Sequence, residues 1–189
     1  MQQVRGLAVS LFITTFFGAL WGMVGAFALS GALSLLAGVL VGTVTVVLLL
    51  GSARLLRLSR RLPVAAGEVG TKNPLGRGSY RLAVLFEVSA IPISAVVLNN
   101  AGYPGAVISA VAVIMGLHFF ALIPAFRSRW FAAVGGAIVA VGLLSLVLST
   151  GTGVSPRGAL VGLGCALVLW VSAFPPLVST LRRAGARPY

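Results

Sequence analysis

Two apolar stretches decide the fold: residues 82–99 read LAVLFEVSAIPISAVVLN, and residues 104–126 read PGAVISAVAVIMGLHFFALIPAF. Each is close to the roughly 20 residues that an α-helix needs to cross the hydrocarbon core of a bilayer. The short segment between them contains Asn and Gly, which are typical of a turn, and Pro follows it directly. Pro104 suits the first position of a helix, where its missing N–H would be unpaired in any case. The two stretches therefore predict a transmembrane helical hairpin.

Four further apolar stretches extend this pattern along the whole chain. They cover residues 6–29, 31–54, 130–149 and 156–181. The first stretch is longer than the core of a secretory signal, so we expect it to be a membrane helix. The sequence predicts an all-α polytopic membrane protein, a six-transmembrane-helix bundle of three helical hairpins, in which residues 1–189 form a single integral membrane domain.

The composition supports a membrane protein and excludes several functions. Of the 189 residues 59% are hydrophobic and 8% are charged, whereas soluble domains carry roughly 25% charged residues. The chain has one Cys, one His and two acids, none of them Asp, so a disulfide framework, a metal centre and a bound metal cofactor are not expected. Neither a Walker A pattern nor a G-x-S-x-G pattern occurs. We expect no cofactor, and the sequence leaves open whether the protein is an enzyme, with a non-enzyme favoured.

The basic residues predict the orientation in the membrane. All but one of the 14 Lys and Arg residues fall on one side of the expected spans, and Arg157 is the exception. By the positive-inside rule, this side is cytoplasmic. We therefore expect both termini in the cytoplasm and the protein in a bacterial plasma (inner) membrane. The basic residues on the predicted cytoplasmic side are Arg5, Arg54, Arg57, Arg60, Arg61, Lys72, Arg77, Arg81, Arg127, Arg129, Arg182, Arg183 and Arg187.

Residues 54–81 form a basic cytoplasmic loop between the second and third spans. At its start, basic residues recur at helical spacing with leucines off that stripe, so the second helix is expected to run on as an amphipathic piece. Such a surface attracts anionic lipid at about 1 kcal/mol per charge. The alternative is a topology determinant that binds nothing specific. Nucleic-acid binding is not expected, because aromatic residues are not interleaved with the charges. The candidate lipid contacts are Arg54, Arg57, Arg60 and Arg61.

Two ionisable residues lie well inside predicted spans: Glu87 and His118. Such residues are costly in a membrane and are functional candidates by default. The turn between their helices centres near residue 102, so both lie about 22–24 Å from it at 1.5 Å per residue. We therefore expect them to be neighbours. Opposite charges reduce each other's cost of burial, and an imidazole can exchange a proton near neutral pH.

Pro92 adds a second feature to the helix that carries Glu87. A proline has no N–H, so the carbonyl of Val88 loses its usual helical donor. Glu87, Ala90 and Ser94 also lie on one side of this helix, which makes a small and polar stripe. Free carbonyls beside an ionisable residue recur in transporter sites. The candidate transport or proton-relay residues are therefore Glu87, His118, Ser94 and Val88. The alternative is a buried Glu-His pair that only holds two helices together.

Glycines four residues apart predict close helix contacts. Three G-x-x-x-G spacings occur within the expected spans, and small residues at this spacing let helix backbones approach. They are Gly18 with Gly22, Gly38 with Gly42, and Gly158 with Gly162.

These observations favour a small permease or transporter subunit, with a polar site between the third and fourth helices that binds or relays a proton or cation. The main alternative is a non-transporting scaffold or accessory subunit, which contacts a partner protein or anionic lipid through the basic loop. An intramembrane enzyme that uses the pair as general acid and base is a third hypothesis. The expected partners are the lipid bilayer, anionic lipid at its cytoplasmic face, and a second copy or a partner membrane subunit.

Overall fold

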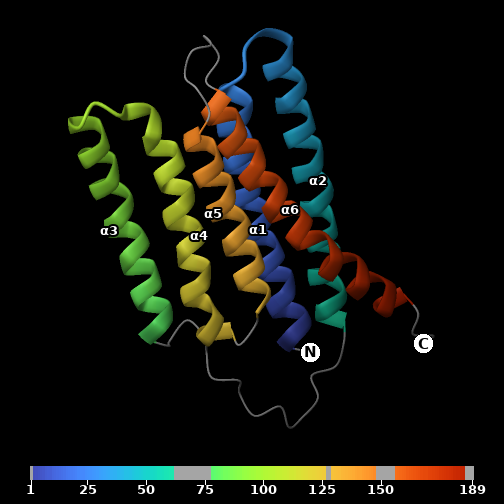
Figure 1. The fold of residues 1–189 in the computed structure, drawn as a ribbon. Helices are drawn as coiled ribbons and strands as arrows, with labels where there is room; N and C mark the ends of the chain where they lie inside the picture. Colours follow the sequence, from blue (N-terminus) through green and yellow to red (C-terminus); the bar gives the residue numbers. More distant parts are fainter. Residues whose placement is uncertain (1, 62–77, 127–128, 148–155, 186–189) are drawn as a thin grey trace.

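The computed structural model describes residues 2–61, 78–126, 129–147 and 156–185. Within these ranges every regular element is a helix (Figure 1). Six of the helices are long and apolar enough to cross a membrane, which confirms the prediction of an all-helical chain with six candidate spans. The elements are α1 (Gln2–Phe27), α2 (Gly31–Arg61), α3 (Gly78–Asn100), the short 3₁₀ helix η2 (Pro104–Ala106), α4 (Val107–Phe126), α5 (Trp130–Val147) and α6 (Pro156–Gly185).

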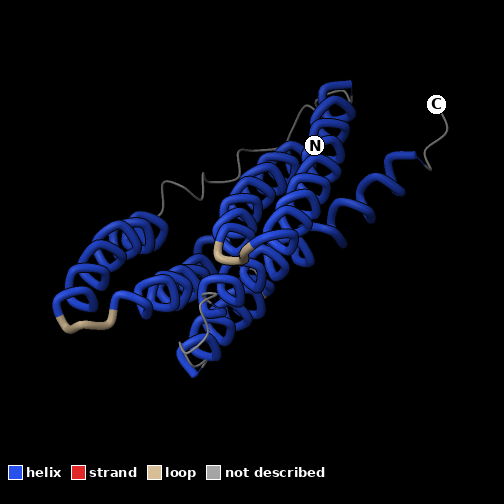
Figure 2. Tube along the Cα trace, turned by 90° about the horizontal axis from the view of Figure 1, so that it is seen from above, coloured by secondary structure: helices blue, strands red, loops and turns tan. Residues whose placement is uncertain are grey.

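The ends of two helices differ from those of the predicted spans. α2 continues to Arg61 as one helix, in line with the expected amphipathic continuation, and α3 begins at Gly78 rather than at Leu82. Neither extension contains a proline that would break the helix. α6 contains Pro175 and Pro176 yet continues to Gly185. The two prolines therefore do not end α6, and the C-terminal end of this helix extends away from the other helices (Figures 1 and 2).

The helices pack in the order α3, α4, α5, α6, α1, α2. Each pair that is consecutive within a predicted hairpin is in contact, and α6 also contacts α1, α2 and α4. α3 lies at one edge of this arrangement and α2 lies toward the other (Figures 1 and 2). In the order of packing, α3 is therefore held to the rest of the molecule through α4.

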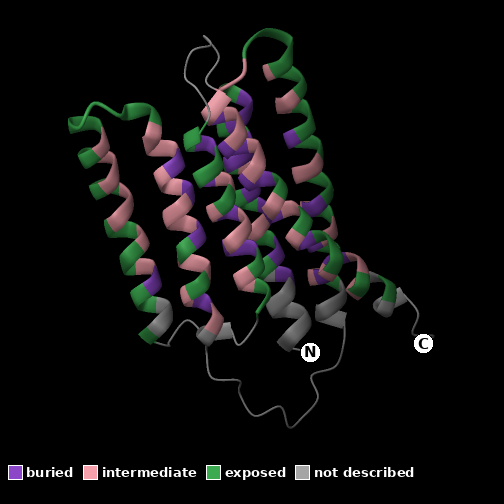
Figure 3. Cartoon of the chain, in the orientation of Figure 1, coloured by how far each residue is buried: buried purple, intermediate pink, exposed green. Residues whose placement is uncertain are grey.

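Two clusters of buried side chains form the core, and both include residues of α6. In the first cluster Cys165 and Leu169 of α6 lie with Trp21 of α1, Ala112 of α4 and Ile138 of α5. The second cluster joins α6 to the lower halves of α1 and α2 as drawn in Figure 1, through Ala8, Leu11, Leu48, Leu55, Ala173 and Leu177. α3 contributes to neither cluster. Among its described residues only Ala83 is fully buried (Figure 3).

Glycines mark the closest helix contacts. A Cβ added to Gly162 of α6 would overlap the backbone of Gly25 of α1, and a Cβ added to Gly135 of α5 would lie 2.6 Å from the carbonyl oxygen of Gly116 of α4. Side chains larger than hydrogen would separate these pairs of helices. Gly18 and Gly22 also face close neighbours on other helices, as predicted.

The packing interpretation is wrong for Gly38 and Gly42. A Cβ added at either position meets no atom within 4 Å among the described residues, because both lie on a face of α2 that no other helix covers. Sequence spacing alone does not reveal which face of a helix is covered.

Gly162→Ala should destabilise the protein, because the new methyl group forces α1 and α6 apart. We expect a loss of about 1–3 kcal/mol in the free energy of unfolding, the usual range for overpacking. Denaturant titration in detergent, followed by tryptophan fluorescence, measures it. Gly42→Ala is the matched control and should be neutral or up to about 1 kcal/mol more stable, because alanine favours the helix. Equal losses in both variants would contradict the assigned contact.

Candidate functional site

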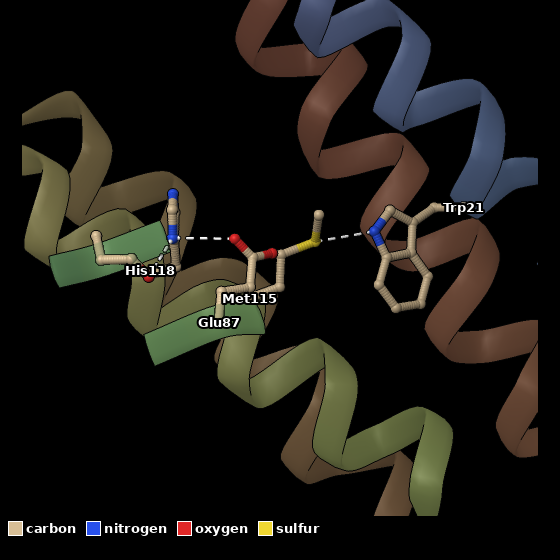
Figure 4. A network of polar contacts seen from close by, with 5 residues as sticks. Trp21, Glu87, Met115 and His118 are labelled. Carbon is tan, nitrogen blue, oxygen red and sulfur yellow. Dashed lines mark hydrogen bonds and ion pairs between the residues drawn. The ribbon is translucent and has the colours of Figure 1, made fainter. Parts of the chain in front are cut away.

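Glu87 of α3 and His118 of α4 lie in contact, as the count from the turn predicts. His118 Nδ1 is 3.0 Å from Glu87 Oε2 (Figure 4). Figure 4 shows the two side chains directed toward each other across the α3–α4 interface. The His118 side chain is 12% exposed and the Glu87 side chain is 24% exposed. The pair is thus largely enclosed, with the carboxylate the more accessible group.

The turn between α3 and α4 explains why the two residues meet. Gly102 has a φ of 82°, a left-handed conformation that favours glycine. The N–H of Tyr103 donates to the carbonyl of Leu98, and the N–H of Gly102 donates to that of Asn99. These bonds form a Schellman motif, which ends α3. Pro104 then starts η2, so the two helices run antiparallel and residues equally far from the turn face each other.

The backbone of α3 supplies a third group that the sequence analysis missed. His118 Nδ1 also lies 3.2 Å from the carbonyl oxygen of Ala83. Ala83 precedes Glu87 by four residues, so it lies on the same face one helical turn away. Ala83 is only 2% exposed, and its small side chain leaves room for the imidazole. The i, i+4 relation to Glu87 is the sequence signal that points to this residue.

Ser94 and Val88 are not brought to the pair. The Ser94 hydroxyl donates to the carbonyl of Ile91 in its own helix, at 2.8 Å. Ser94 lies about two turns beyond Glu87 and lines an open groove of about 700 Å³, with Ile114 of α4 on its other wall. Neither Glu87 nor His118 lines this groove. Val88 is 66% exposed on the uncovered face of α3. Of the four predicted residues, the structure therefore brings the side chains of Glu87 and His118 together, and the role of the Val88 carbonyl stays a prediction.

A polar contact one turn before His118 on α4 links this region to the core. Met115 precedes His118 by three residues, and its sulfur accepts a hydrogen bond from Trp21 Nε1 of α1 at 2.9 Å (Figure 4). This contact joins α4 to α1. No sequence pattern indicated it, because a methionine and a tryptophan in apolar helices are usually only core residues.

Three polar residues fix the ends of α4, α5 and α6 near the α3–α4 turn. Ser109 and Ser145 have their hydroxyl oxygens 2.6 Å apart and are fully buried. Ser145 donates to the carbonyl of Gly142, so Ser109 donates to Ser145. Arg157 Nε donates to the carbonyl of Ser145 at 3.1 Å, close to the C-terminal end of α5. A cation at a helix C-terminus is stabilising, so Arg157 has a structural role in addition to its place in the charge pattern.

The basic end of α2 has the predicted amphipathic division. Leu55 is fully buried against α1 and α6 in the second core cluster, whereas Arg54 and Arg57 are exposed. The side chains of Arg60 and Arg61 lie outside the described part of the structure, as does the rest of the predicted loop from residue 62 to residue 77. Two of the four candidate lipid contacts are thus placed on an open surface.

Within the described ranges, no group of three or more His, Cys, Asp or Glu residues gathers as a metal site would require. The chain matches no known protein family, no curated protein and no solved structure. The chemistry of Glu87 and His118 is therefore the evidence from which a function can be argued.

A double-mutant cycle tests whether the Glu87–His118 contact stabilises the fold. We expect Glu87→Leu and His118→Leu to be coupled by about 1–2 kcal/mol, the range for polar contacts between membrane helices. Unfolding of the two single variants and the double variant in detergent gives this value. Ser94→Ala, the control, should change stability by less than about 0.5 kcal/mol, because its hydroxyl bonds only its own helix. Additive effects of the two leucine substitutions would contradict the contact.

Proposed function

We propose that this protein is a small permease or transporter, or a subunit of one, in which Glu87 and His118 bind or relay a proton or cation. The observation that carries the proposal is the 3.0 Å contact between their side chains, within two helices apolar enough to cross a membrane. Ionisable residues are expensive inside a bilayer, where they pair with one another and mark ion pathways and proton relays.

The position of the pair supports a site that exchanges ions with its surroundings. α3 lies at the edge of the packing order, and Glu87 is 24% exposed there. The carboxylate therefore lies outside the two core clusters around α6. A pair that served only to hold helices would be expected to be fully enclosed, because an exposed carboxylate facing lipid costs free energy.

The proposal includes an orientation. Both termini and the segment from residue 54 to residue 81 would face the cytoplasm of a bacterial cell, with the protein in the plasma (inner) membrane. The support is the distribution of basic residues along the chain, with Arg157 the exception.

Proton flux in liposomes tests the transport function directly. The native protein should dissipate an imposed pH gradient, and Glu87→Gln should reduce the flux at least about tenfold, since a positioned acid or base typically contributes about 10²–10⁴-fold to a proton transfer. A pH-sensitive dye inside the liposomes reports the rate. Glu68→Gln is the matched control, because it makes the same change at the other acid of the chain, and its flux should equal that of the native protein. Equal flux in both variants would remove Glu87 from the mechanism.

A second candidate function is a non-transporting membrane subunit that binds anionic lipid, with the Glu87–His118 pair as a structural contact. The observation that favours it is the exposure of Arg54 and Arg57 beside the buried Leu55. Burial of the leucine against α6 fixes the rotation of this part of α2, so both guanidinium groups are held on the uncovered face. Arginine is well suited to the phosphate of a lipid head group.

The combined variant Arg54→Gln, Arg57→Gln tests lipid binding. At about 1 kcal/mol per charge, its affinity for phosphatidylglycerol should fall by roughly 30-fold, and binding of the native protein should weaken as salt increases. Native mass spectrometry of the protein in detergent measures the bound lipid. Phosphatidylcholine is the control, and its binding should be the same in both proteins. Unchanged phosphatidylglycerol binding would exclude these arginines as the lipid contacts.

A further inference from the structure

The surroundings of His118 determine which of its two nitrogens carries hydrogen. Nδ1 has two oxygen neighbours, Glu87 Oε2 at 3.0 Å and the Ala83 carbonyl oxygen at 3.2 Å. A backbone carbonyl can only accept a hydrogen bond. If Nδ1 carried a lone pair instead, two acceptors would face each other at 3.2 Å. The contact with Ala83 therefore requires a hydrogen on Nδ1, shared between the carbonyl and the carboxylate.

With the hydrogen on Nδ1, Glu87 Oε2 is the acceptor of the bond from His118. An ionised Glu87 suits this place best, because a carboxylate has acceptor oxygens only and accepts a stronger hydrogen bond than a carboxylic acid does. In a neutral imidazole one nitrogen donates and the other accepts, so Nε2 carries the lone pair. Figure 4 shows Nε2 on the side of the ring turned away from Glu87, and it makes no hydrogen bond among the described residues.

We propose that the ion taken up by this site is a proton and that it binds at Nε2 of His118. The inference rests on the proposed transport function and assigns its substrate. The proton adds to the Nε2 lone pair and gives an imidazolium with N–H groups on both nitrogens. The pair changes from a net charge of −1 to zero, and release from Nε2 reverses the step.

The energetics favour this uptake over binding of a metal cation. A net negative charge at membrane depth is costly, and one proton neutralises the pair. A sodium or potassium ion coordinated by Glu87 Oε2 and the Ala83 carbonyl would instead lie beside the hydrogen on Nδ1, whose partial positive charge repels a cation. These hard cations prefer several oxygen ligands, and the Ser94 hydroxyl, which donates to Ile91, lies about two turns away.

Few other charged groups can compensate for Glu87. On α3 the described charged side chain is Arg81, which is exposed near the start of the helix, and on α4 His118 is the described titratable group. Arg129 is exposed just before α5, which packs against the far side of α4. Neither arginine forms an ion pair with Glu87 in the described part of the structure. His118 is therefore the group whose protonation balances the carboxylate.

Nitrogen NMR of the single histidine tests the assignment without an activity assay. Protein labelled with ¹⁵N-histidine yields signals from one imidazole, since the chain contains one His. In liposomes at alkaline pH we expect a protonated Nδ1 and a bare Nε2, and acidification should protonate Nε2. Adding sodium or potassium at constant alkaline pH should leave both signals unchanged. A bare Nδ1 with a protonated Nε2, or a shift of the signals with sodium or potassium, would overturn the proposal.

Two variants separate the role of the Ala83 carbonyl from that of Glu87. In Glu87→Gln the side-chain amide oxygen can still accept from Nδ1, and in Glu87→Leu the Ala83 carbonyl remains as the acceptor. Both should retain the hydrogen on Nδ1, and its transfer to Nε2 in both would overturn the positioning role of Ala83. The NMR result is independent of the flux assay: absent flux with hydrogen on Nδ1 contradicts transport only, and flux with hydrogen on Nε2 contradicts this proton site only.

Discussion

An apolar surrounding imposes two conditions on a protein. It contains no hydrogen-bond partners for the backbone, and it removes the hydrophobic driving force for packing apolar side chains against each other. The first condition explains why every described regular element is a helix, since a helix pairs its own N–H and C=O groups. The second means that helices associate through close contact or polar groups. In this protein the closest approach is glycine against glycine, at Gly25 with Gly162 and at Gly116 with Gly135. These contacts organise α1 with α6 and α4 with α5.

The α3–α4 interface is built differently, and this difference creates the candidate site. α3 contains no glycine after Gly78 and adds nothing to the two core clusters. Its contact with α4 includes an ionisable pair and the small side chain of Ala83 instead. An edge helix attached in this way leaves Glu87 partly exposed. α3, which adds nothing to the two core clusters, thus carries the one acid that lies inside the described spans.

Much of the site could be predicted from the number of residues between each side chain and the turn. In antiparallel helices joined by a tight turn, residues at similar distances from the turn lie side by side. Glu87 and His118 stand at nearly equal distances along the chain from Gly102, and the structure places them in contact. The same count says nothing about rotation of a helix around its own axis. Ser94 was expected at the site because it shares a stripe with Glu87, but its hydroxyl bonds its own backbone. Gly38 and Gly42 have the same spacing as Gly18 and Gly22, yet they face no neighbour.

The sequence by itself determined the number of candidate spans, their approximate ends and the pairing of Glu87 with His118. These features depend on local hydropathy, on breakers such as Pro104 and on distance along a helix, all of which are encoded within short segments. Only the tertiary structure decided the packing order, the covered face of each helix and the contact of His118 with the Ala83 carbonyl. These features depend on contacts between segments far apart in the chain, where helices with nearly uniform apolar surfaces admit many arrangements and shape complementarity at a few small residues selects one.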